Sequence, residues 1–525
     1  MRFQQQENIL NSLKIISDAN NIIGKIVASG DINMLVQLLD NVIMLFVKVE
    51  DAIKSSAGSE GKTLKLVSGF KHSLLEKQKN MQASKKMDES ITEHINRFIK
   101  TITNSVITDL KPNSLEVVFI ASRPSTIGSM ETVFHAASAD KNCDVYFIPV
   151  GFHDKQPFDT DIEYYKNLGF NPINFEAYDF KTRRPDIIFF DYPYDAFGEQ
   201  YAGEYKMFSF FLRNNCKLLV HIPYYIACYS DRLKMTGKYT HTGGIAHAHY
   251  TIFQSEFIRR IAIQEYKEYE SENNVTNAFG KAEEKFVALG SPKFDLLVTT
   301  KEDDYVLPKE WNELITRPDG TRKKIIFFNT HFRGFLQFGF QYFKKVEFFL
   351  NIARKYNNFA ILWRPHPLTH LDVGIDPEVL AALNTLVEMF KKEKLGIYDK
   401  SSDINRAVML SDALYGNGSS VQTMFVALCK PVMRMNYDIE VVTENSNPLP
   451  TINPNDSLDL MYEETEDCNI FNLIKHLTQP QIIDEALIKK QKAQAIERFG
   501  PLDGGVGNSI YEFCKDKAML LSTQS

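Results

Sequence analysis

From residue 115 onward, short runs of β-branched and aromatic residues alternate with longer segments whose apolar residues recur at helical spacing. Near-continuous apolar runs separated by helices are typical of parallel strands that are buried on both faces. Two such series predict an α/β protein with two Rossmann-like, doubly wound domains facing a cleft. The predicted strands are 115–120, 145–150, 187–190, 217–220 and 252–254 in the first series, and 324–328, 359–363, 396–398, 413–415 and 431–433 in the second.

The first 111 residues have a different pattern. None of the 20 prolines lies there, and apolar residues such as Ile9, Leu13 and Ile16 recur at helical spacing. We therefore predict an all-helical region before the two α/β domains. The predicted division is 1–111 for this helical region, 112–285 for the first Rossmann-like domain, 286–481 for the second, and 482–525 for C-terminal helices that pack back on the first domain.

Composition sets the broad class of the protein. A chain of 525 residues with 44% hydrophobic and 24% charged residues is long enough for several globular cores. The formal net charge of −6 gives no general attraction to nucleic acid, so no nucleic-acid partner is predicted. The six cysteines have no metal-like spacing, and the N-terminus has no apolar signal segment. We expect a cytoplasmic location.

A basic segment lies within the helical region. Residues 62–86 carry seven lysines and one glutamate, interleaved with apolar residues such as Leu64, Val67 and Phe70. One interpretation is an amphipathic helix that contacts the anionic inner face of the plasma membrane. The alternative is the solvated face of a helix in a small bundle.

The ends of the predicted strands in the second domain carry the candidate chemistry. Ligands of open α/β sheets bind beyond the carboxyl ends of the strands. Arg364 could fork onto phosphate oxygens, and His366 could donate to them or take a proton. Glycines let a phosphate approach the backbone, and serines at a helix start can donate to it. The candidate nucleotide and phosphate residues are Thr330, Arg364, Tyr398, Gly416, Asn417, Gly418, Ser419 and Ser420, with His366 as a candidate catalytic residue.

Each of these motifs also has a purely structural interpretation. The segment Gly416–Ser420 is compatible with a tight turn that caps a helix, and the prolines around His366 with the end of a strand. Their joint placement at strand ends of one sheet favours a functional role.

The first domain offers candidates on the acceptor side. His221 follows a predicted strand and is the candidate general base, because imidazole titrates near neutral pH. Its alternative is a histidine whose ring is satisfied by neighbouring backbone. The other candidates are Arg123, Ser125, Asp191 and His241. His241, His247 and His249 lack a carboxylate partner close in sequence, so no metal site is predicted.

Signatures of other enzyme classes do not occur. The sequence has no P-loop, no Gly-x-Ser-x-Gly elbow and no Gly-x-Gly-x-x-Gly after the first strand. The strongest sequence indicators of nucleotide hydrolases, α/β-hydrolases and dehydrogenases are therefore missing.

Three segments together resemble a known family. They are Gly-Ser-Pro-Lys-Phe-Asp at 290–295, Arg-Pro-His-Pro at 364–367, and 411–420 followed by Lys-Pro-Val at 430–432. This combination is similar to the CDP-glycerol glycerophosphotransferases, the teichoic-acid primases and polymerases of GT-B fold, over about residues 115–440. The resemblance implies transfer of glycerol phosphate from CDP-glycerol to a hydroxyl of a lipid-linked or polymeric acceptor at the cytoplasmic membrane face. It places His366 and the serines 419 and 420 around the donor pyrophosphate, and His221 near a catalytic histidine of the family.

The chain departs from the family pattern at three places. His221 is followed by Ile-Pro where the family has Gly-Thr, and Asn417 replaces an acidic residue. The segment Asn-Thr-His-Phe-Arg at 329–333 replaces Pro-Thr-Trp/Phe-Arg. The resemblance therefore implies a divergent member, with glycerol phosphate or a related polyol phosphate as the transferred group.

The leading hypothesis is a GT-B transferase that uses a CDP-activated donor and needs no metal or other cofactor. Its partners would be that donor and a lipid-linked or cell-surface glycan acceptor. One alternative is a nucleotide-sugar glycosyltransferase on the same fold. Another is a catalytically silent GT-B scaffold whose helical region binds a partner protein.

Overall fold

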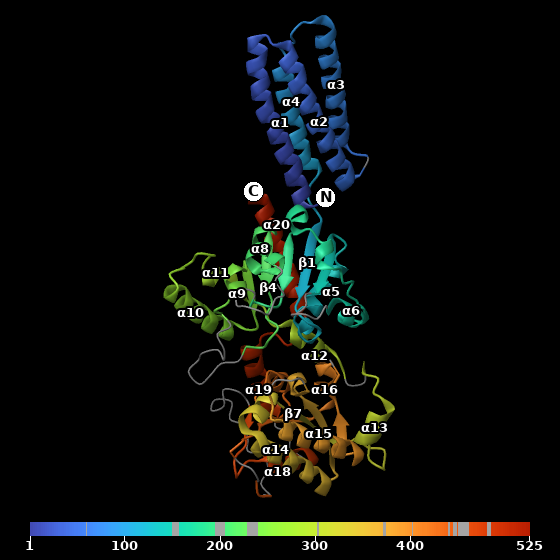
Figure 1. The fold of residues 1–525 in the computed structure, drawn as a ribbon, viewed down its shortest axis with the longest axis vertical. Coiled ribbons are helices and arrows are strands. Elements are labelled where there is room, and N and C mark those ends of the chain that lie inside the picture. Colours follow the sequence, from blue (N-terminus) through green and yellow to red (C-terminus); the bar gives the residue numbers. More distant parts are fainter. Residues whose placement is uncertain are drawn as a thin grey trace.

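The fold class predicted from the sequence is confirmed in the computed structural model. Two parallel six-stranded sheets form two α/β domains, and a helical bundle precedes them. The bundle stands at one end of an elongated molecule, the first domain lies in the middle and the second domain at the other end (Figure 1). The structure describes residues 1–58, 60–149, 157–194, 205–227, 240–301, 304–370, 374–401, 403–438, 442–444, 449, 461–479 and 485–524.

Four long helices form the N-terminal bundle. Their buried faces follow the periodicity read from the sequence, with Ile9, Leu13 and Ile16 fully buried on the first helix. The first helix ends at Gly30, whose φ of 78° provides the left-handed C-cap, and the carboxylate of Asp31 caps the second by accepting from the N–H of Met34 at 3.0 Å. The helices are α1 (Phe3–Ser29), α2 (Ile32–Ala57), α3 (Lys62–Ser84) and α4 (Ile91–Asp109).

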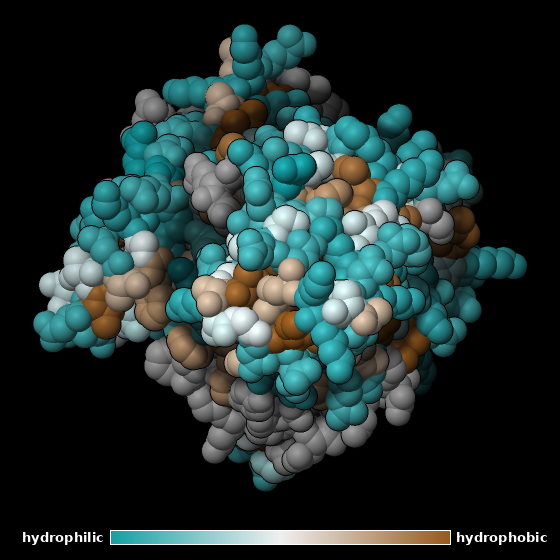
Figure 2. All heavy atoms as spheres, turned by 90° about the horizontal axis from the view of Figure 1, so that it is seen from above, coloured by the Kyte–Doolittle hydropathy of each residue, from teal (hydrophilic) through white to brown (hydrophobic). Residues whose placement is uncertain are grey.

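The basic helix α3 turns its apolar face into this bundle. Leu64, Val67 and Phe70 are buried in the bundle core, and Phe70 stacks on Phe98 of α4 at 4.4 Å between ring centroids. The apolar face of this helix is therefore occupied by the bundle core, which leaves its polar face for any contact with a membrane. Seen from the bundle end, the surface is mostly hydrophilic, with small, separate hydrophobic patches (Figure 2).

Within the part of the chain that the structure describes, one helical stretch is long and apolar enough to cross a membrane. It is Ile32–Ser56 in α2. Leu35, Val42 and Phe46 of this stretch are fully buried in the bundle. A third of the apolar window is buried in this way, so the helix turns one face into the bundle core.

An ionic network joins the bundle to the first sheet. Glu116, near the start of β1 (Leu115–Ala121), is 1% exposed and accepts from Arg2 at 2.7 Å and from Arg183 at 2.6 Å. Arg2 also pairs with Ser114 as an isolated parallel bridge. The bundle is thus fixed to the amino end of β1, the end opposite to the one at which ligands bind.

The first domain contains one strand more than the sequence analysis predicted. Phe286–Ala288 forms β6, which pairs in parallel with β5. The predicted boundary between residues 285 and 286 is therefore wrong, because these residues complete the first sheet. A strand of three residues next to a helical turn is too short to show a period of its own. In the order β2-β1-β3-β4-β5-β6, the other strands are β2 (Cys143–Pro149), β3 (Ile187–Phe190), β4 (Leu218–His221) and β5 (Tyr250–Phe253).

Short helices connect the strands of the first domain. The main core beside β1 is aromatic, with Phe119, Phe134 and Phe147 among its members. The helices are η1 (Pro124–Ser129), α5 (Glu131–Ala139), α6 (Pro157–Asn167), η2 (Phe175–Ala177), α7 (Phe180–Arg183), η3 (Tyr205–Met207), α8 (Ser209–Asn214), α9 (Gly243–His247), α10 (Glu256–Glu272), α11 (Ala282–Lys285), η4 (Pro292–Phe294) and α12 (Asp295–Thr299).

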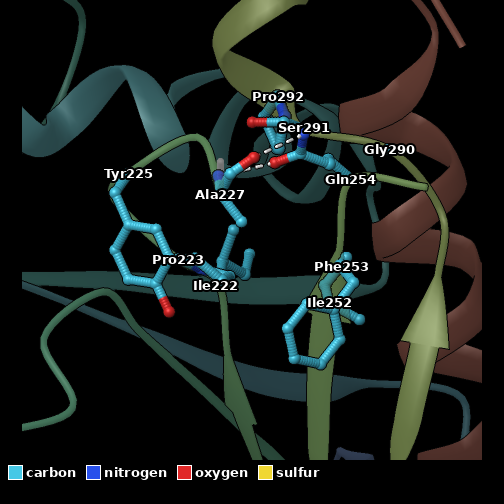
Figure 3. A pocket seen from close by; sticks show the side chains of 10 residues that line it. All are labelled: Ile222, Pro223, Tyr225, Ala227, Ile252, Phe253, Gln254, Gly290, Ser291 and Pro292. Carbon is cyan, nitrogen blue, oxygen red and sulfur yellow. Dashed lines mark hydrogen bonds between the residues drawn. The ribbon is translucent and has the colours of Figure 1, made fainter. Parts of the chain in front are cut away.

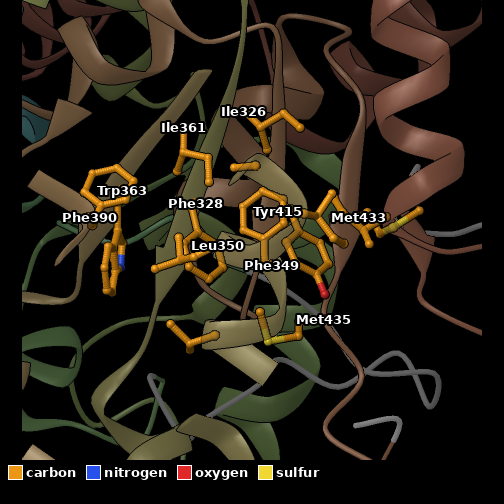
Figure 4. Packing of buried hydrophobic residues seen from close by; sticks show 14 of the residues in the cluster. Ile326, Phe328, Phe349, Leu350, Ile361, Trp363, Phe390, Tyr415, Met433 and Met435 are labelled. Carbon is orange, nitrogen blue, oxygen red and sulfur yellow. The ribbon is translucent and has the colours of Figure 1, made fainter. Parts of the chain in front are cut away.

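The second domain has the strand order β12-β11-β10-β7-β8-β9, all parallel. On one face of the sheet Phe328, Trp363 and Tyr415 pack against Phe349 and Leu350 of a long helix (Figure 4). The two-residue strand β12 was not predicted. The strands are β7 (Lys324–Thr330), β8 (Phe359–Pro365), β9 (Gly396–Tyr398), β10 (Ala413–Gly416), β11 (Val432–Arg434) and β12 (Tyr462–Glu463).

The long helix of this domain has a kink. Helix α14 starts at Phe332 and has non-helical backbone at Gly339, where φ is 48°. The kink separates a first segment beside the end of β7 from a second segment on the sheet. The helices of this domain are α13 (Lys309–Ile315), α14 (Phe332–Lys355), η6 (Pro367–His370), α15 (Pro377–Lys392), α16 (Ile404–Leu410), α17 (Val421–Ala427) and α18 (Ile470–Thr478).

The C-terminal segment returns to the first domain. Helix α20 (Val506–Gln524) packs on α5 and contributes Val506, Ile510 and Tyr511 to the first domain's core. Helix α19 (Glu485–Phe499) instead contacts both α10 of the first domain and α17 of the second. The C-terminal residues thus connect the two domains.

The Gly-Ser-Pro-Lys-Phe-Asp segment at 290–295 holds the C-terminal segment against the first domain. The carboxylate of Asp295 accepts from the N–H groups of Val506 and Gly507, at 3.0 and 2.7 Å, and from the hydroxyl of Thr132 at 2.8 Å. Gly290 has a φ of 112°, and a Cβ there would lie 2.7 Å from the side chain of Val506. The motif therefore has a structural role in joining three segments.

Candidate functional site

The carboxyl ends of the two sheets meet at the domain boundary. Glu131 follows the loop after β1, and Asp403 follows the loop after β9. The carboxylate of Asp403 is close enough to raise the pKa of Glu131. Residues after the strands of both domains therefore face the same boundary, which is where both sheets are expected to bind ligands.

The turn after β10 is open at this boundary. Gly416 lies so close to β7 that a Cβ would approach the carbonyl oxygen of Asn329 to 2.3 Å, so only glycine fits there. Gly418 and Ser420 are exposed, and nothing lies within 4 Å of a Cβ placed on Gly418. Ser419 donates to the side-chain oxygen of Asn329 at 3.1 Å. The hydroxyl of Ser420 makes no capping bond to α17, so it is available to a ligand.

Two histidines from neighbouring strand ends lie side by side. His331 follows β7 and His366 follows β8, with 4.3 Å between their ring centroids. The ring of Phe332 lies 5.0 Å from that of His366. Burial lowers the pKa of both imidazoles, that of His331 to about 4, and the charge of Arg333 lowers both further. The sequence analysis identified His366 but did not select His331.

Asn417 is a structural hub, which corrects its prediction as a phosphate ligand. Its side chain is 2% exposed, and its Oδ1 accepts from the N–H of His331 at 3.2 Å and from the hydroxyl of Tyr342. Its Nδ2 donates to the hydroxyl of Tyr437. An amide supplies both an acceptor and a donor here, so Asn417 holds the turn after β7 against the turn after β10.

The prediction that Arg364 forks onto phosphate is also wrong in this structure. Its guanidinium pairs with Asp399 and donates to the hydroxyl and the carbonyl of Ser401. Thr330 is fully buried and accepts from the indole N–H of Trp363 at 3.0 Å. Tyr398 lies on the edge strand β9 with its ring 5.3 Å from that of Trp363. These three residues shape the strand ends behind the two histidines.

Asp191 is the centre of a buried polar cluster in the first domain. Its carboxylate accepts from the N–H and hydroxyl of Ser122, both at 3.0 Å, and from the hydroxyl of Thr126 at 2.5 Å. Burial raises the pKa of Asp191 to about 6, and these donors partly offset the rise. Arg123 beside it is exposed, whereas the side chain of Ser125 lies outside the described residues. The cluster orders the loop after β1.

His221 does not reach the domain boundary, so its prediction as a cleft-facing base is wrong for this structure. The side chain is fully buried, and its ring lies 5.2 Å from that of Phe190 on the neighbouring strand. Burial lowers its pKa to about 3, which the backbone of Asp191 only partly offsets. A histidine that is neutral and enclosed at pH 7 is poorly placed to accept a proton from a substrate.

The other histidines of the first domain have separate partners. The Nε2 of His241 lies 3.3 Å from the carbonyl oxygen of Glu265, midway along α10 and away from the carboxyl ends of the strands. His247 pairs with the hydroxyl of Ser209, and His249 accepts from the N–H of Leu219. His241 is therefore not brought together with the other acceptor-side candidates. Within the described ranges, no group of three or more His, Cys, Asp or Glu side chains is placed to hold a metal ion.

A small pocket lies at the carboxyl ends of β4, β5 and β6 (Figure 3). Its polar rim is closed by Gln254, whose amide exchanges two hydrogen bonds with the backbone of Ala227, at 2.8 and 3.2 Å. The rest of the lining is mainly apolar: Ile222, Pro223, Ile252, Phe253 and Pro292. Such a lining does not suit a phosphate group.

Two charged residues at the boundary were missed by the sequence analysis. Lys293 donates to the carbonyl oxygen of Tyr224 at 2.7 Å, and burial lowers its pKa to about 8, an effect that Asp191 partly offsets. Burial raises the pKa of Glu131 to about 7, and Asp403 adds to the rise. Neither residue stands at a predicted strand end, because Glu131 follows the 3-10 helix η1 and Lys293 lies within η4, and neither turn had a signal of its own.

Glu131 predicts a pH-dependent stability. In the folded protein this carboxyl keeps its proton up to about pH 7, whereas in the unfolded chain it releases it near pH 4.5. The stability contributed by the protonated form is therefore complete below pH 4.5 and is lost as the pH rises through 7. The glutamine of Glu131→Gln has no proton to release in this range, so the variant keeps that stability at high pH. We therefore expect the melting temperature of this variant to exceed that of the wild type by more at pH 8 than at pH 5.

Asp403→Asn provides the matched control for this effect. The carboxylate of Asp403 caps α16 by accepting from the N–H of Arg406 at 3.0 Å, and asparagine can do the same. Removing the neighbouring charge lowers the pKa of Glu131, so this variant should show a weaker loss of stability at high pH. Melting curves of wild type and Glu131→Gln that stay parallel from pH 5 to pH 8 would show that Glu131 is not protonated in the fold.

Comparisons with known proteins bear on the second domain above all. Residues 254–446 match the model of the family described as CDP-Glycerol:Poly(glycerophosphate) glycerophosphotransferase. This match confirms the resemblance seen in the sequence motifs, and it supports a transferase of the glycerophosphotransferase type. No curated protein matches the chain significantly.

Solved structures provide distant neighbours. MnaA of S. aureus, solved with UDP, is 14% identical, with a TM-score of 0.48 over 77% of this chain and 96% of the other. The UDP-GlcNAc 2-epimerase of Neisseria meningitidis, bound to UDP-GlcNAc, is 11% identical, with a TM-score of 0.45 over 77% of this chain and 100% of the other. A variant of the wall teichoic acid polymerase TagF, soaked with CDPG, is 15% identical, with a TM-score of 0.41 over 78% of this chain and 89% of the other.

Proposed function

Because residues 254–446 match the CDP-glycerol:poly(glycerophosphate) glycerophosphotransferase family, we propose that this chain transfers glycerol phosphate, or a related polyol phosphate, from a CDP-activated donor. The acceptor would be a hydroxyl group of a lipid-linked or cell-surface glycan. The observation that carries the proposal is that the matched segment contains the strand ends at which His366, Ser419 and Ser420 meet the domain boundary.

In the proposed reaction these protein groups contact the phosphates of the donor. The acceptor oxygen attacks the β-phosphorus and forms a new P–O bond. The P–O bond to CMP breaks, and CMP leaves with the electron pair. Charge develops on the phosphate oxygens in this step, and hydrogen-bond donors that are already in place stabilise it. The imidazole of His366 and the hydroxyl of Ser420 are such donors, since the fold uses neither its Nε2 nor the serine hydroxyl for capping.

The proton of the acceptor hydroxyl needs a base on the first-domain side. His221 is enclosed and has a low pKa, so we assign this role to Glu131 instead. A carboxylate with a pKa of about 7 at a domain boundary is suited to accept a proton near neutral pH. In this proposal the turnover of the wild type is expected to rise between pH 6 and pH 8, and Glu131→Gln is expected to remove that rise.

A donor panel tests the proposal and its alternative. The purified protein is offered CDP-glycerol, CDP-ribitol and UDP-sugars with a glycerol-phosphate-primed lipid acceptor, and the released nucleotide is identified. We expect CMP to be released from a CDP-polyol only when the acceptor is present. Release of UDP from a UDP-sugar, with no CMP from any CDP-polyol, would contradict the proposal and favour a nucleotide-sugar glycosyltransferase.

We also propose that the transfer needs no metal ion. The histidine and serine donors, together with the cation of Arg333, can offset the developing phosphate charge. We therefore expect turnover with CDP-glycerol to stay within about twofold of its initial value after treatment with excess EDTA and desalting. A loss that added Mg²⁺ or Mn²⁺ restores would contradict this expectation.

Contact with the inner face of the cytoplasmic membrane is a further part of the proposal. Since the apolar face of α3 is buried, only electrostatic attraction through its exposed lysines remains. Lys65, Lys79, Lys85 and Lys86 are exposed, whereas Lys71 and Lys77 pair with Glu50 and Asp88.

Vesicle flotation tests this contact. We expect the protein to float with vesicles that contain anionic lipid, and to float less as the salt concentration rises from about 0.05 to 0.5 M, since salt screens exposed charges. Changing these four lysines and Lys62, which is also exposed, to glutamine should abolish flotation without unfolding the bundle. Equal flotation of both proteins, or flotation with neutral vesicles, would count against an electrostatic contact.

A further inference from the structure

His331 and His366 form a pair, of which the proposed chemistry uses only His366. The two rings come from the ends of adjacent strands, β7 and β8, and their centroids are 4.3 Å apart with 44° between their planes. Phe332 contacts both rings, with centroid distances of 4.6 and 5.0 Å. His331 stands where the chain departs from the family pattern, in the segment Asn-Thr-His-Phe-Arg.

The backbone fixes which nitrogen of each ring is free. The Nδ1 of His331 accepts from the N–H of Arg333 at 3.2 Å, and the Nδ1 of His366 accepts from the N–H of Leu368 at 3.2 Å. A neutral imidazole whose Nδ1 is an acceptor carries its proton on Nε2. Each ring therefore has an Nε2–H group as a donor, held in orientation by the turn that follows its strand.

The pKa of both rings is lowered, which favours the neutral form of each. Burial is the largest cause of the lowered pKa of each, and His366 also lowers the pKa of His331. Arg333, exposed at the start of α14, places a positive charge beside the pair. Two neutral N–H donors next to a guanidinium suit an anion that spans two sites, such as a diphosphate.

Hydrogen bonds to buried side chains fix the position of His331. Its backbone N–H donates to the side chain of Asn417, which Tyr342 and Tyr437 hold in turn. Gly334 lies so close to Tyr342 that a Cβ would approach its ring to 2.7 Å. The turn is thus built to a fixed geometry.

We propose that His331 and His366 together clamp the diphosphate of a nucleotide donor, with one Nε2–H group on each phosphate. This inference rests on the proposed function and deepens it, because it makes His331 a second binding residue of the donor site. The ligand class is a nucleoside diphosphate or its ester.

Asparagine and glutamine variants separate the two tasks of His331. Asparagine reproduces the acceptor at Nδ1 and keeps the cap of α14, but has no group at the position of Nε2. Glutamine places an amide N–H near that position. Equilibrium binding of CDP to the full chain should weaken about tenfold or more in His331→Asn and by no more than about threefold in His331→Gln. Unchanged melting of His331→Asn would show that the cap is intact.

Nitrogen NMR of protein with isotope-labelled histidines tests directly whether both rings contact the diphosphate. Resonances of His331 and His366 are assigned by their absence in the glutamine variants, and CDP is then titrated into the wild type. We expect the Nε2 signals of both residues to move with the same apparent affinity. If CDP binds and moves only His366, the clamp is wrong while the proposed function stands. If CDP, CDP-glycerol and UDP all fail to bind, the proposed function fails, and the clamp with it.

Discussion

Replacing His366 with asparagine is expected to lower turnover with CDP-glycerol by about 100-fold or more, because loss of one preorganised donor to a developing oxyanion costs about 10²–10³ in rate. The effect should fall on turnover more than on the Michaelis constant, since the charge develops only in the transition state. The measurement is steady-state release of CMP by the wild type and the variant.

The fold supplies a matched control for this variant. His366 accepts from the N–H of Leu368 through Nδ1, a bond that the asparagine side chain can also accept, so His366→Asn should melt like the wild type. His366→Gln should recover part of the activity because its amide N–H lies near the position of Nε2. If His366→Asn folds normally and its turnover does not fall, the site is wrong. The silent scaffold then becomes the better account.

Replacing Lys345 with methionine is expected to destabilise the second domain by about 3–5 kcal/mol, the cost of removing one partner from a buried ion pair. Lys345 of α14 is 1% exposed and lies 2.9 Å from Glu464, which is also buried. Glu464 accepts in addition from the hydroxyl of Tyr415 and the N–H of Asn436. Without the ammonium, the carboxylate would remain charged among neutral donors.

Both tryptophans lie in the second domain, at Trp311 and Trp363, so fluorescence during denaturant unfolding reports on this domain. The double variant Lys345→Met/Glu464→Gln should recover a large part of the loss, because no unpaired charge is left. Lys344→Met, at the exposed neighbouring position, should change stability by no more than about 0.5 kcal/mol. A loss in Lys345→Met no larger than that of Lys344→Met would show that the pair is not buried in solution.

The architecture could be predicted because parallel strands and amphipathic helices have strong periodic signals. The strands of three or fewer residues were harder. Gly396–Tyr398 and Val432–Arg434 follow clear helices and were found, whereas Phe286–Ala288 and Tyr462–Glu463 were not. Their pairing depends on a neighbouring strand, and that information is not local in the sequence.

The candidate site could be predicted only to the level of strand ends. His366 and the serines 419 and 420 follow the ends of β8 and β10, where ligands of such sheets bind. Whether a polar side chain at a strand end faces a ligand or the core is decided by tertiary contacts. His221 and Asn417 are buried in this way, since both faces of a parallel sheet are covered, and Arg364 is paired with Asp399.

In the proposed donor site, the second domain binds a cytidine nucleotide with its diphosphate between His366 and the turn that contains Ser419 and Ser420. A crystal structure of the full chain soaked with CDP would test this placement. We expect density for the diphosphate within hydrogen-bond distance of the His366 Nε2 and the Ser420 hydroxyl. Nucleotide density bound elsewhere, with this turn empty, would contradict it.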